Sequence, residues 1–174
     1  LVRLDVRARH ARRRHEPRAH LPDDALEGRR ARGHVVEVDP FEREVAGIEL
    51  VPLAQEKAIE LRFVKTALAV RSDRRLLRRL LQNLISNAIK YTPHGRVLVG
   101  CRRAKGKIRI DVYDTGLGIP LSQQKSIFRE FKRLDEGAKI ARGLGLGLSI
   151  VERIARLLKH PLKLVSQPGR GSHF

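Results

Sequence analysis

The residues best suited to chemistry begin with a pair of asparagines. Asn83 and Asn87 are four residues apart in the segment 83–91, so on a helix they share one face. Amide oxygens are hard, neutral ligands that suit Mg²⁺, which in proteins usually keeps several waters and binds substrate phosphates. Lys90 lies on the neighbouring face and can reach a phosphate. Taken alone, the pair fits two exposed asparagines on a surface helix slightly better than it fits a binding site.

A carboxylate and two glycines form a second motif at residues 114–120, which read Asp-Thr-Gly-Leu-Gly-Ile-Pro directly after a predicted strand. The carboxylate of Asp114 can accept a hydrogen bond from an exocyclic amine such as that of adenine. Gly116 and Gly118 permit positive φ and a close approach of the backbone to a ligand. An ordinary Asp-Gly loop does not need so long a motif, so the pattern favours a binding site.

A third motif opens a predicted helix and alternates glycine with leucine: Gly143, Leu144, Gly145, Leu146, Gly147 and Leu148. Free backbone N–H groups and the macrodipole at such a helix N-terminus attract phosphate. The motif lacks the βαβ setting of a dinucleotide-binding fingerprint and the Gly-Lys-Ser/Thr of a Walker A loop. A fourth motif, Gly169–Phe174, predicts only a turn when taken alone.

A long helix must carry the asparagine pair. Ser72 is a fair N-cap for a helix that runs from Asp73 to about Tyr91. Its apolar positions recur at spacings of three and four, which predicts a buried stripe. The stripe consists of Leu76, Leu77, Leu80, Leu81, Leu84, Ile85, Ala88 and Ile89.

Strands and further helices must surround that helix. Alternation of apolar and polar residues, and the positions of glycine and proline, place these elements. We expect the end of a helix at 53–58, a strand at 60–64 with a hairpin partner at 67–70, a turn at 92–95, antiparallel strands at 96–103 and 107–114, helices at 121–131 and 148–159, and a strand at 162–165.

Composition divides the chain near residue 45. Residues 1–45 hold eleven Arg, four His and no Lys, and they show no sustained periodicity. We expect an irregular or poorly ordered segment there and one folded domain over residues 46–174. The single cysteine, Cys101, excludes an intrachain disulfide and suggests a structural thiol. The net charge of +18 indicates either a basic proteome or attraction to polyanions such as nucleic acid.

Together and in this order, the motifs resemble the catalytic ATP-binding domain of sensor histidine kinases, in the wider class of gyrase, Hsp90 and mismatch-repair ATPases. The resemblance covers about Leu53 to Phe174. It implies an α/β fold, a two-layer sandwich with a mixed sheet of about five strands and three helices on one face. It also implies that the last strand is still running at Phe174. The matching segments are 83–91 for the N box, 114–118 for the G1 box, 128–131 for the F box, 143–147 for the G2 box and 169–174 for the last glycine box.

The resemblance further implies ATP and Mg²⁺ as cofactors and a role for each matching residue. Asn83 and Asn87 should face Mg²⁺ and the phosphates, and Lys90 should contact phosphate. Arg133 should lie near the lid and the γ-phosphate, which makes Asn83, Lys90 and Arg133 the expected catalytic residues. Asp114 should bind the adenine amine. The other residues expected at the cofactor are Tyr91, Gly116, Gly118, Ile119, Phe131, Ser172 and the lid from Gly143 to Leu148.

One position bears on the reaction. ATP-hydrolysing relatives usually carry a Glu at the place of Asn83, and an amide is not a general base near neutral pH. Asn83 therefore favours phosphoryl transfer to a histidine on a separate helical hairpin. The implied partners are that dimerisation domain and the receiver domain of a response regulator, with a homodimer only in a longer parent protein. The implied location is cytoplasmic, and the cytoplasmic part of a membrane-bound sensor kinase is compatible with it.

The first 45 residues depart from that family, because two long dimerising helices are expected there and are absent. The string His15-Glu16-Pro17-Arg18 resembles an acceptor motif, but Pro17 interrupts the helix that such a motif needs, so we interpret it as a chance match. Two alternatives stay open. One is a degenerate nucleotide-binding module that regulates a partner without kinase activity. The other is a basic nucleic-acid-binding module, although no aromatic platform, helix-turn-helix or zinc signature supports it.

Overall fold

The computed structural model describes residues 35–37, 50–66, 68–130 and 145–174. Within them, five strands form one mixed sheet in the order β2-β4-β5-β7-β6. β2 and β4 pair in parallel, and the other neighbours are antiparallel. The strands are β2 Ile59–Phe63, β4 Gly95–Ala104, β5 Lys107–Asp114, β6 Val165–Gln167 and β7 Gly171–His173. The mixed sheet of five strands expected from the resemblance is confirmed.

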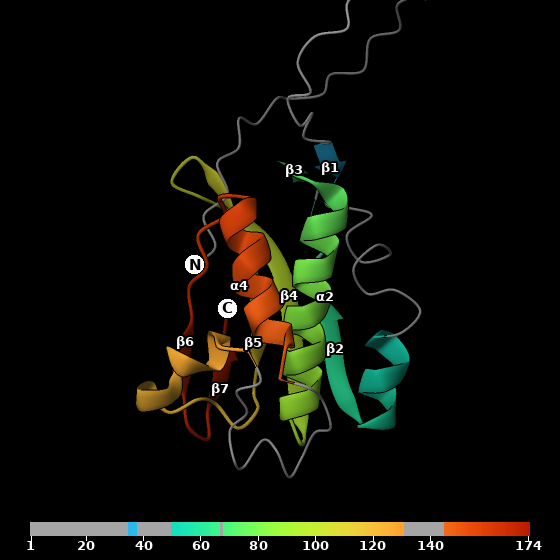
Figure 1. The fold of residues 1–174 in the computed structure, drawn as a ribbon. Helices are drawn as coiled ribbons and strands as arrows, with labels where there is room; N and C mark the ends of the chain where they lie inside the picture. The colour runs from blue at the N-terminus through green and yellow to red at the C-terminus, as the bar shows by residue number, and fades with distance from the viewer. Residues whose placement is uncertain (1–34, 38–49, 67, 131–144) are drawn as a thin grey trace, which may run out of the picture.

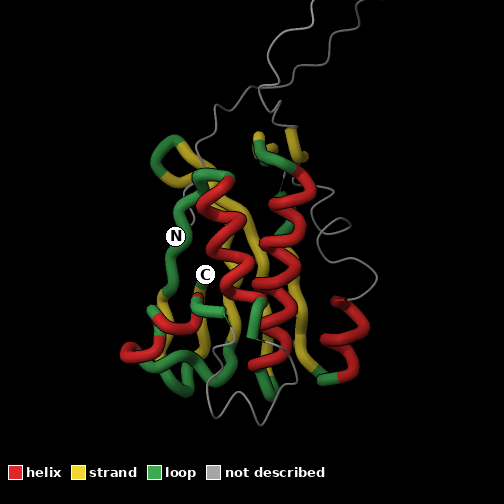
Figure 2. The backbone as a smooth tube through the Cα atoms, viewed as in Figure 1, coloured by secondary structure: helices red, strands yellow, loops and turns green. Residues whose placement is uncertain are grey.

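In the described part of the chain, three helices accompany this sheet: residues 50–56, α2 Arg74–Tyr91 and α4 Gly147–Leu157. α2 and α4 lie side by side against one face of the sheet (Figure 1), and the tube in Figure 2 shows both in front of the strands. Leu50 and Ala54 of the first helix belong to the same core. The predicted two-layer α/β sandwich is therefore confirmed.

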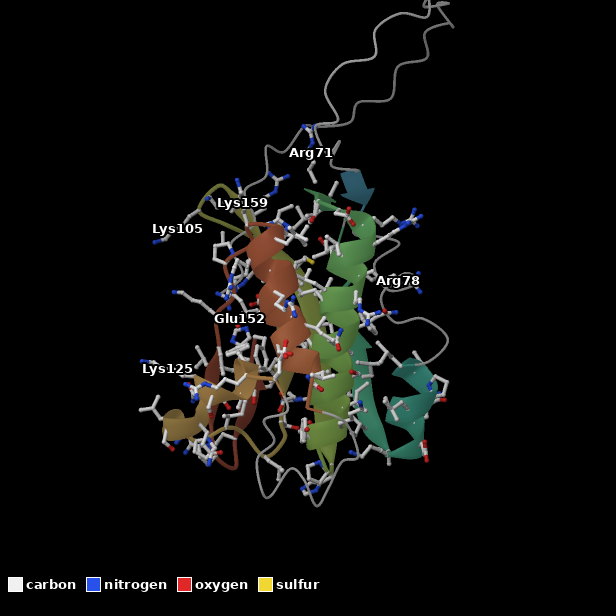
Figure 3. All side chains as sticks on the ribbon, viewed as in Figure 1. Arg71, Arg78, Lys105, Lys125, Glu152 and Lys159 are labelled. Atoms are coloured by element: carbon white, nitrogen blue, oxygen red, sulfur yellow. The ribbon has the colours of Figure 1, made fainter. Side chains whose placement is uncertain are left out.

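The predicted stripe of α2 forms the centre of the core. Its buried members are Leu77, Leu80, Leu81, Leu84, Ile85, Ala88 and Ile89. They pack with inward residues of β4 and β5, among them Val97, Val99 and Val112. Full burial of each large aliphatic side chain contributes about 1.5–3 kcal/mol. Arginines occupy the opposite face of the helix, and Figure 3 shows Arg78 there, with its side chain at the surface.

The start of α2 differs from the prediction by one residue. Asp73, and not Ser72, is the N-cap, and its Oδ1 accepts a hydrogen bond from the Leu76 N–H at 2.9 Å. Ser72 is buried, and its hydroxyl lies 2.9 Å from Nε2 of His160. The carboxylate takes the capping role because the Ser72 hydroxyl is used to join the N-terminal end of α2 to the residues that follow α4.

The predicted hairpin of residues 60–64 with 67–70 is wrong. β3, Ala69–Arg71, pairs with β1, Val35–Glu37, in a separate two-stranded sheet. The connection from Val64 to Leu68 contains no Gly, Asn or Asp to form a tight hairpin turn. β2 instead pairs in parallel with β4, a strand distant in the sequence. The remainder of the segment 1–45, beyond β1, lies outside the described residues.

Two other elements differ from their predictions. Residues 121–131 do not form one helix, because the described part holds two short 3₁₀ turns, η1 Leu121–Gln123 and η2 Ser126–Phe128. The Ser126 hydroxyl donates to the Gln123 carbonyl at 3.0 Å, and such local bonds compete with a continuous helix. The strand expected at 162–165 begins only at Val165, where pairing with β7 starts.

The outward face of the sheet carries a polar cluster on β5 and β7. Arg109 and Asp111 alternate with the inward Ile108, Ile110 and Val112, as predicted. Asp111 accepts hydrogen bonds from Nε of Arg109 and, at 2.8 Å, from Nε2 of His173. Burial raises the pKa of Asp111, but these two partners and their charges outweigh it and hold the pKa below its ordinary value.

Asp111→Asn is expected to lower the free energy of unfolding by about 1 kcal/mol at neutral pH, because charged hydrogen bonds at a partly exposed site are lost. A carboxyl group with a lowered folded pKa stabilises the protein above its ordinary pKa, and that stabilisation disappears as pH falls through the folded pKa. Urea unfolding at a series of pH values measures the difference between variant and wild type. A difference that persists unchanged in strong acid would show that the charge of Asp111 does not cause it.

The thiol of Cys101 on β4 agrees with a structural role. Burial, followed by the negative charge of Asp111, raises the pKa of Cys101 to about 12. The thiol therefore stays protonated near neutral pH, and a protonated thiol is a poor nucleophile.

Candidate nucleotide-binding site

Asp114 ends β5 and is only 6% exposed. Both of its hydrogen bonds go to Oδ1, from the Gly116 N–H at 2.9 Å and the Ser172 N–H at 3.1 Å. Among the described residues, Oδ2 has no partner, so it is available as an acceptor. Burial raises the pKa of Asp114, and the two backbone N–H groups oppose that rise in part. The carboxylate is thus held through Oδ1, and Oδ2 can accept a hydrogen bond from a ligand.

The glycines beside Asp114 are required by the packing of three backbone segments. A Cβ on Gly116 would collide with the Tyr91 carbonyl oxygen and lie 2.8 Å from Oγ1 of Thr92. Gly118, at φ +69°, lies directly against the Gln167 carbonyl oxygen, where a Cβ would not fit. From the sequence, these glycines were expected to let the backbone approach a ligand. The structure shows that they also bring residues 114–118 against α2 and the β6–β7 turn.

A serine outside every predicted motif ties this end of the site together. The Ser166 hydroxyl accepts from the Ile119 N–H at 2.8 Å and donates to the Gly171 carbonyl at 2.9 Å. It also lies 3.0 Å from the hydroxyl of Ser172. These bonds hold Ile119 and Ser172, both predicted at the cofactor, next to Asp114. Serine is common in turns, so nothing in the local sequence marked Ser166.

The asparagine pair meets the start of α4. Nδ2 of Asn83 donates to the Arg79 carbonyl at 2.7 Å, which fixes the amide group. A Cβ built on Gly147 would lie 3.3 Å from Oδ1 of Asn83, and 3.2 and 3.5 Å from Nδ2 and Oδ1 of Asn87. The structure therefore brings the second half of the glycine-leucine motif directly against both predicted metal ligands.

The first turn of α4 has backbone N–H groups that no side chain caps. Its N-cap residue is Leu146, and the preceding Gly145 has φ +73°. The hydroxyl of Ser149 points back to the Leu146 carbonyl, at 2.8 Å, so it does not occupy the N–H groups. Together with the helix dipole, these groups favour an anion beside Asn83 and Asn87.

α2 joins the two ends of the site. Asn83 and Tyr91 are eight residues apart, which corresponds to about 12 Å along the axis. The Leu117 N–H donates to the Tyr91 carbonyl at 3.1 Å, so the Asp114 loop is attached to the last turn of the helix. The side chain of Lys90 has no hydrogen bond or ion pair within the described part of the chain. It is free to turn toward a phosphate.

Four predicted site residues lie outside the described residues: Phe131, Arg133, Gly143 and Leu144. The neighbouring Phe128, from the same aromatic pair as Phe131, packs edge-on against Phe174, with ring centroids 6.5 Å apart. The remaining residues expected at the cofactor lie on α2, at the end of β5 and in the loop after it, at the start of α4, or on β7.

Comparison with known proteins identifies the class of domain. Residues 72–174 match the family model described as histidine kinase-, DNA gyrase B-, and HSP90-like ATPase. The chain belongs to this family, and the matched region is the ATP-binding catalytic domain of the sensor histidine kinase type. The resemblance inferred from the motifs is confirmed.

Curated relatives carry sensor kinase names. Sensor protein DivL of Caulobacter vibrioides is 42% identical over 106 residues, which make up 60% of this chain and 13% of DivL. Adaptive-response sensory kinase SasA of Thermosynechococcus vestitus is 43% identical over 100 residues, which make up 56% of this chain and 26% of SasA. The chain thus matches less than a third of the length of either relative.

Solved structures agree with the fold, and one of them contains a nucleotide analogue. Full-length ShkA in complex with AMPPNP is similar with a TM-score of 0.69 and 30% identity, over 87% of this chain and 31% of ShkA. The catalytic domain of histidine kinase ThkA gives the same TM-score at 25% identity, over 82% of this chain and 91% of that domain. Within the described ranges of this chain, no helix has the length and apolar character needed to cross a bilayer.

Proposed function

We propose that this domain binds ATP with Mg²⁺ across α2 and positions the γ-phosphate for transfer to a histidine on a separate dimerisation domain. The observation that carries the proposal is the arrangement at the two ends of the site. Asp114 presents one free carboxylate oxygen at the base end. Asn83 and Asn87 meet the uncapped start of α4 at the phosphate end. A nucleotide fits this arrangement. Its adenine amine can donate to the carboxylate of Asp114, and its phosphates can accept from the N–H groups at the start of α4.

At the base end, Oδ2 of Asp114 accepts a hydrogen bond from the amine of adenine. Gly116, Gly118 and Ile119 form the wall of the base pocket, and Tyr91 packs against the nucleotide from the last turn of α2. Ser172 is held beside Asp114 by its own N–H bond and by its hydroxyl contact with Ser166. A site built to pair with one amine discriminates strongly against bases that lack it.

At the phosphate end, the donor set fits Mg²⁺. Oδ1 of Asn83 faces Gly147 because its Nδ2 is used by the Arg79 carbonyl, so a hard oxygen ligand points toward the site. When bound with the nucleotide, Mg²⁺ neutralises phosphate charge. Lys90 and the backbone N–H groups of residues 145–148 hold the phosphates, and Phe131, Arg133, Gly143 and Leu144 complete the lid and the catalytic set.

Transfer, and not hydrolysis, is the reaction that these residues support. Position 83 is an amide, which cannot remove a proton from water near neutral pH. Phosphoryl transfer depends chiefly on positioning and charge neutralisation, which the donors described here can provide. The histidine-bearing dimerisation domain and the receiver domain of a response regulator are the proposed partners.

The proposal predicts a specific loss on Asn87→Ala. Affinity for AMPPNP should fall about tenfold in the presence of Mg²⁺, because one ligand of the metal is removed, and should change little in EDTA. Isothermal calorimetry under both conditions measures the difference. Ser86→Ala, on the adjacent position of α2, is the control and should bind as wild type does. An Asn87→Ala protein with undiminished Mg²⁺ dependence would exclude the metal role.

A regulatory module without kinase activity is the second candidate. It requires only the nucleotide site and makes no use of a histidine-bearing hairpin. Incubating the domain with a separate histidine hairpin protein and γ-labelled ATP distinguishes the two. Label on the histidine supports the kinase, whereas AMPPNP binding without label on the histidine supports the regulator.

A further inference from the structure

A lysine outside all the motifs holds the carboxyl end of α2. An α-helix leaves its last four carbonyl groups without partners inside the helix. Lys57 directly follows the helix of residues 50–56. Its ammonium group donates to three carbonyl oxygens, at 3.1, 2.7 and 3.4 Å: those of Ile89, Lys90 and Thr92.

The two neighbouring carbonyls have other partners. The Thr92 hydroxyl donates to the Ala88 carbonyl at 2.7 Å. The Leu117 N–H donates to the Tyr91 carbonyl at 3.1 Å. Every carbonyl from Ala88 to Thr92 is therefore satisfied, and Lys57 supplies three of these five bonds. Lys57 makes more of these bonds than any other side chain.

The ammonium group is fixed by its surroundings. It has three N–H donors, and all three point to neutral carbonyl oxygens. No carboxylate pairs with Lys57 within the described ranges. A cation at a helix C-terminus is favoured by the macrodipole, although burial lowers the pKa of this lysine. Lys57 is half-buried, and its three hydrogen bonds to carbonyl oxygens make it a cap of the helix end.

This cap lies where both halves of the nucleotide site are joined. Lys90 and Tyr91 are on the last turn of α2. The Tyr91 carbonyl receives the Leu117 N–H and packs against Gly116, so the loop that carries Asp114 is attached to the same turn. The helix end is held by Lys57 on one side and by the Asp114 loop on the other.

We infer that Lys57 is a positioning residue of the nucleotide site. It sets the last turn of α2 against the Asp114 loop, and thereby fixes the spacing between Asp114 at the base end and Lys90 at the phosphate end. The inference rests on the proposed nucleotide function. It adds to the site a residue that lies outside the family's motifs, in the turn after the helix of residues 50–56.

Lys57→Met keeps the length of the side chain and removes all three donors. We expect affinity for Mg²⁺-AMPPNP to fall about tenfold, the effect of losing a charge-assisted hydrogen bond that holds the pocket. Without nucleotide, the Leu117 amide hydrogen should exchange about tenfold faster, because the turn that accepts it opens more often. Calorimetry and hydrogen exchange on the whole chain, well below its melting temperature, measure both effects. Lys57→Arg, which keeps a cation with several donors, should recover most of the affinity.

Ser72→Ala is the matched control, because it removes an anchor of α2 at its opposite end. It should lower the melting temperature but leave AMPPNP affinity and Leu117 exchange unchanged. A Lys57→Met protein that behaves in the same way would overturn the positioning role. If Lys57→Met fails to fold, Lys57→Gln replaces it in the test. In Lys57→Gln, AMPPNP affinity should fall and Leu117 exchange should accelerate, each about threefold. If wild type binds no AMPPNP, the proposed function fails, and the Leu117 exchange result still decides the role of Lys57.

Discussion

Asp114→Asn is expected to weaken AMPPNP binding by about a hundredfold or more, without lowering the stability of the free domain. The Asn oxygen can keep the two backbone bonds from Gly116 and Ser172, which now go to Oδ1. Its NH₂ group then replaces Oδ2 and directs a donor at the donor amine of adenine. Two opposed donors in a buried site repel and leave each other unsatisfied, so a nearly isosteric change removes recognition.

The stability of the free Asp114→Asn protein should equal or exceed that of wild type. Burial raises the pKa of Asp114, which means that the folded state disfavours the charged form, and a neutral amide avoids that cost. Calorimetry and thermal melting measure the two properties. Asp111→Asn, on the outward face of the same strand, should show the reverse pattern of normal binding and reduced stability. Equal AMPPNP affinity in wild type and Asp114→Asn would rule out adenine recognition by Asp114.

Gly171→Ala should destabilise the domain by more than about 3 kcal/mol and abolish nucleotide binding. Gly171 has φ +90°, and its Cβ would collide with the Asp114 carbonyl oxygen while lying 2.9 Å from Cα of Thr115. These are backbone atoms of the neighbouring strand and loop, so the clash is relieved only by separating β7 from the end of β5. The Ser172 N–H, one of two donors to Asp114, would move with it.

Gly169→Ala is the control for backbone conformation in the same turn. Gly169 has φ +73°, close to that of Gly171, but a Cβ there meets nothing within 4 Å. Its cost should be about 1 kcal/mol, the strain of a left-handed residue alone, and binding should persist. Urea unfolding and AMPPNP titration compare the two variants. Similar losses in both would mean that strain, and not the approach of β7 to Asp114, explains the requirement for Gly171.

Periodicity predicted the long helix and the central strands well, because they are long and their burial is one-sided. The stripe of α2 and the alternation along β5 each repeat over many residues, so single exceptions do not obscure the pattern. The short elements were predicted poorly. Residues 121–131 and the partner of β2 depend on local side-chain bonds and on strand pairing between distant segments, which periodicity does not report.

For the site, the sequence alone determined the chemical types of the groups. The asparagine pair, Asp114 and the glycine motifs were recognisable because their residue types and order are specific to one family. Tertiary structure decided which of them meet. Gly147 reaches the asparagine pair only because α4 packs on α2. Ser172 reaches Asp114, 58 residues away, because β7 pairs with β5.

Two residues that hold the site could not be recognised from the sequence. Lys57 and Ser166 belong to no motif, and each acts by binding carbonyl or N–H groups of distant segments. Backbone groups are the same at every position, so a side chain that binds them leaves no complementary residue type to find in the sequence. The sequence therefore determined what the domain can bind, and the packing of α2, the Asp114 loop and the β6–β7 turn decided how the binding groups are held.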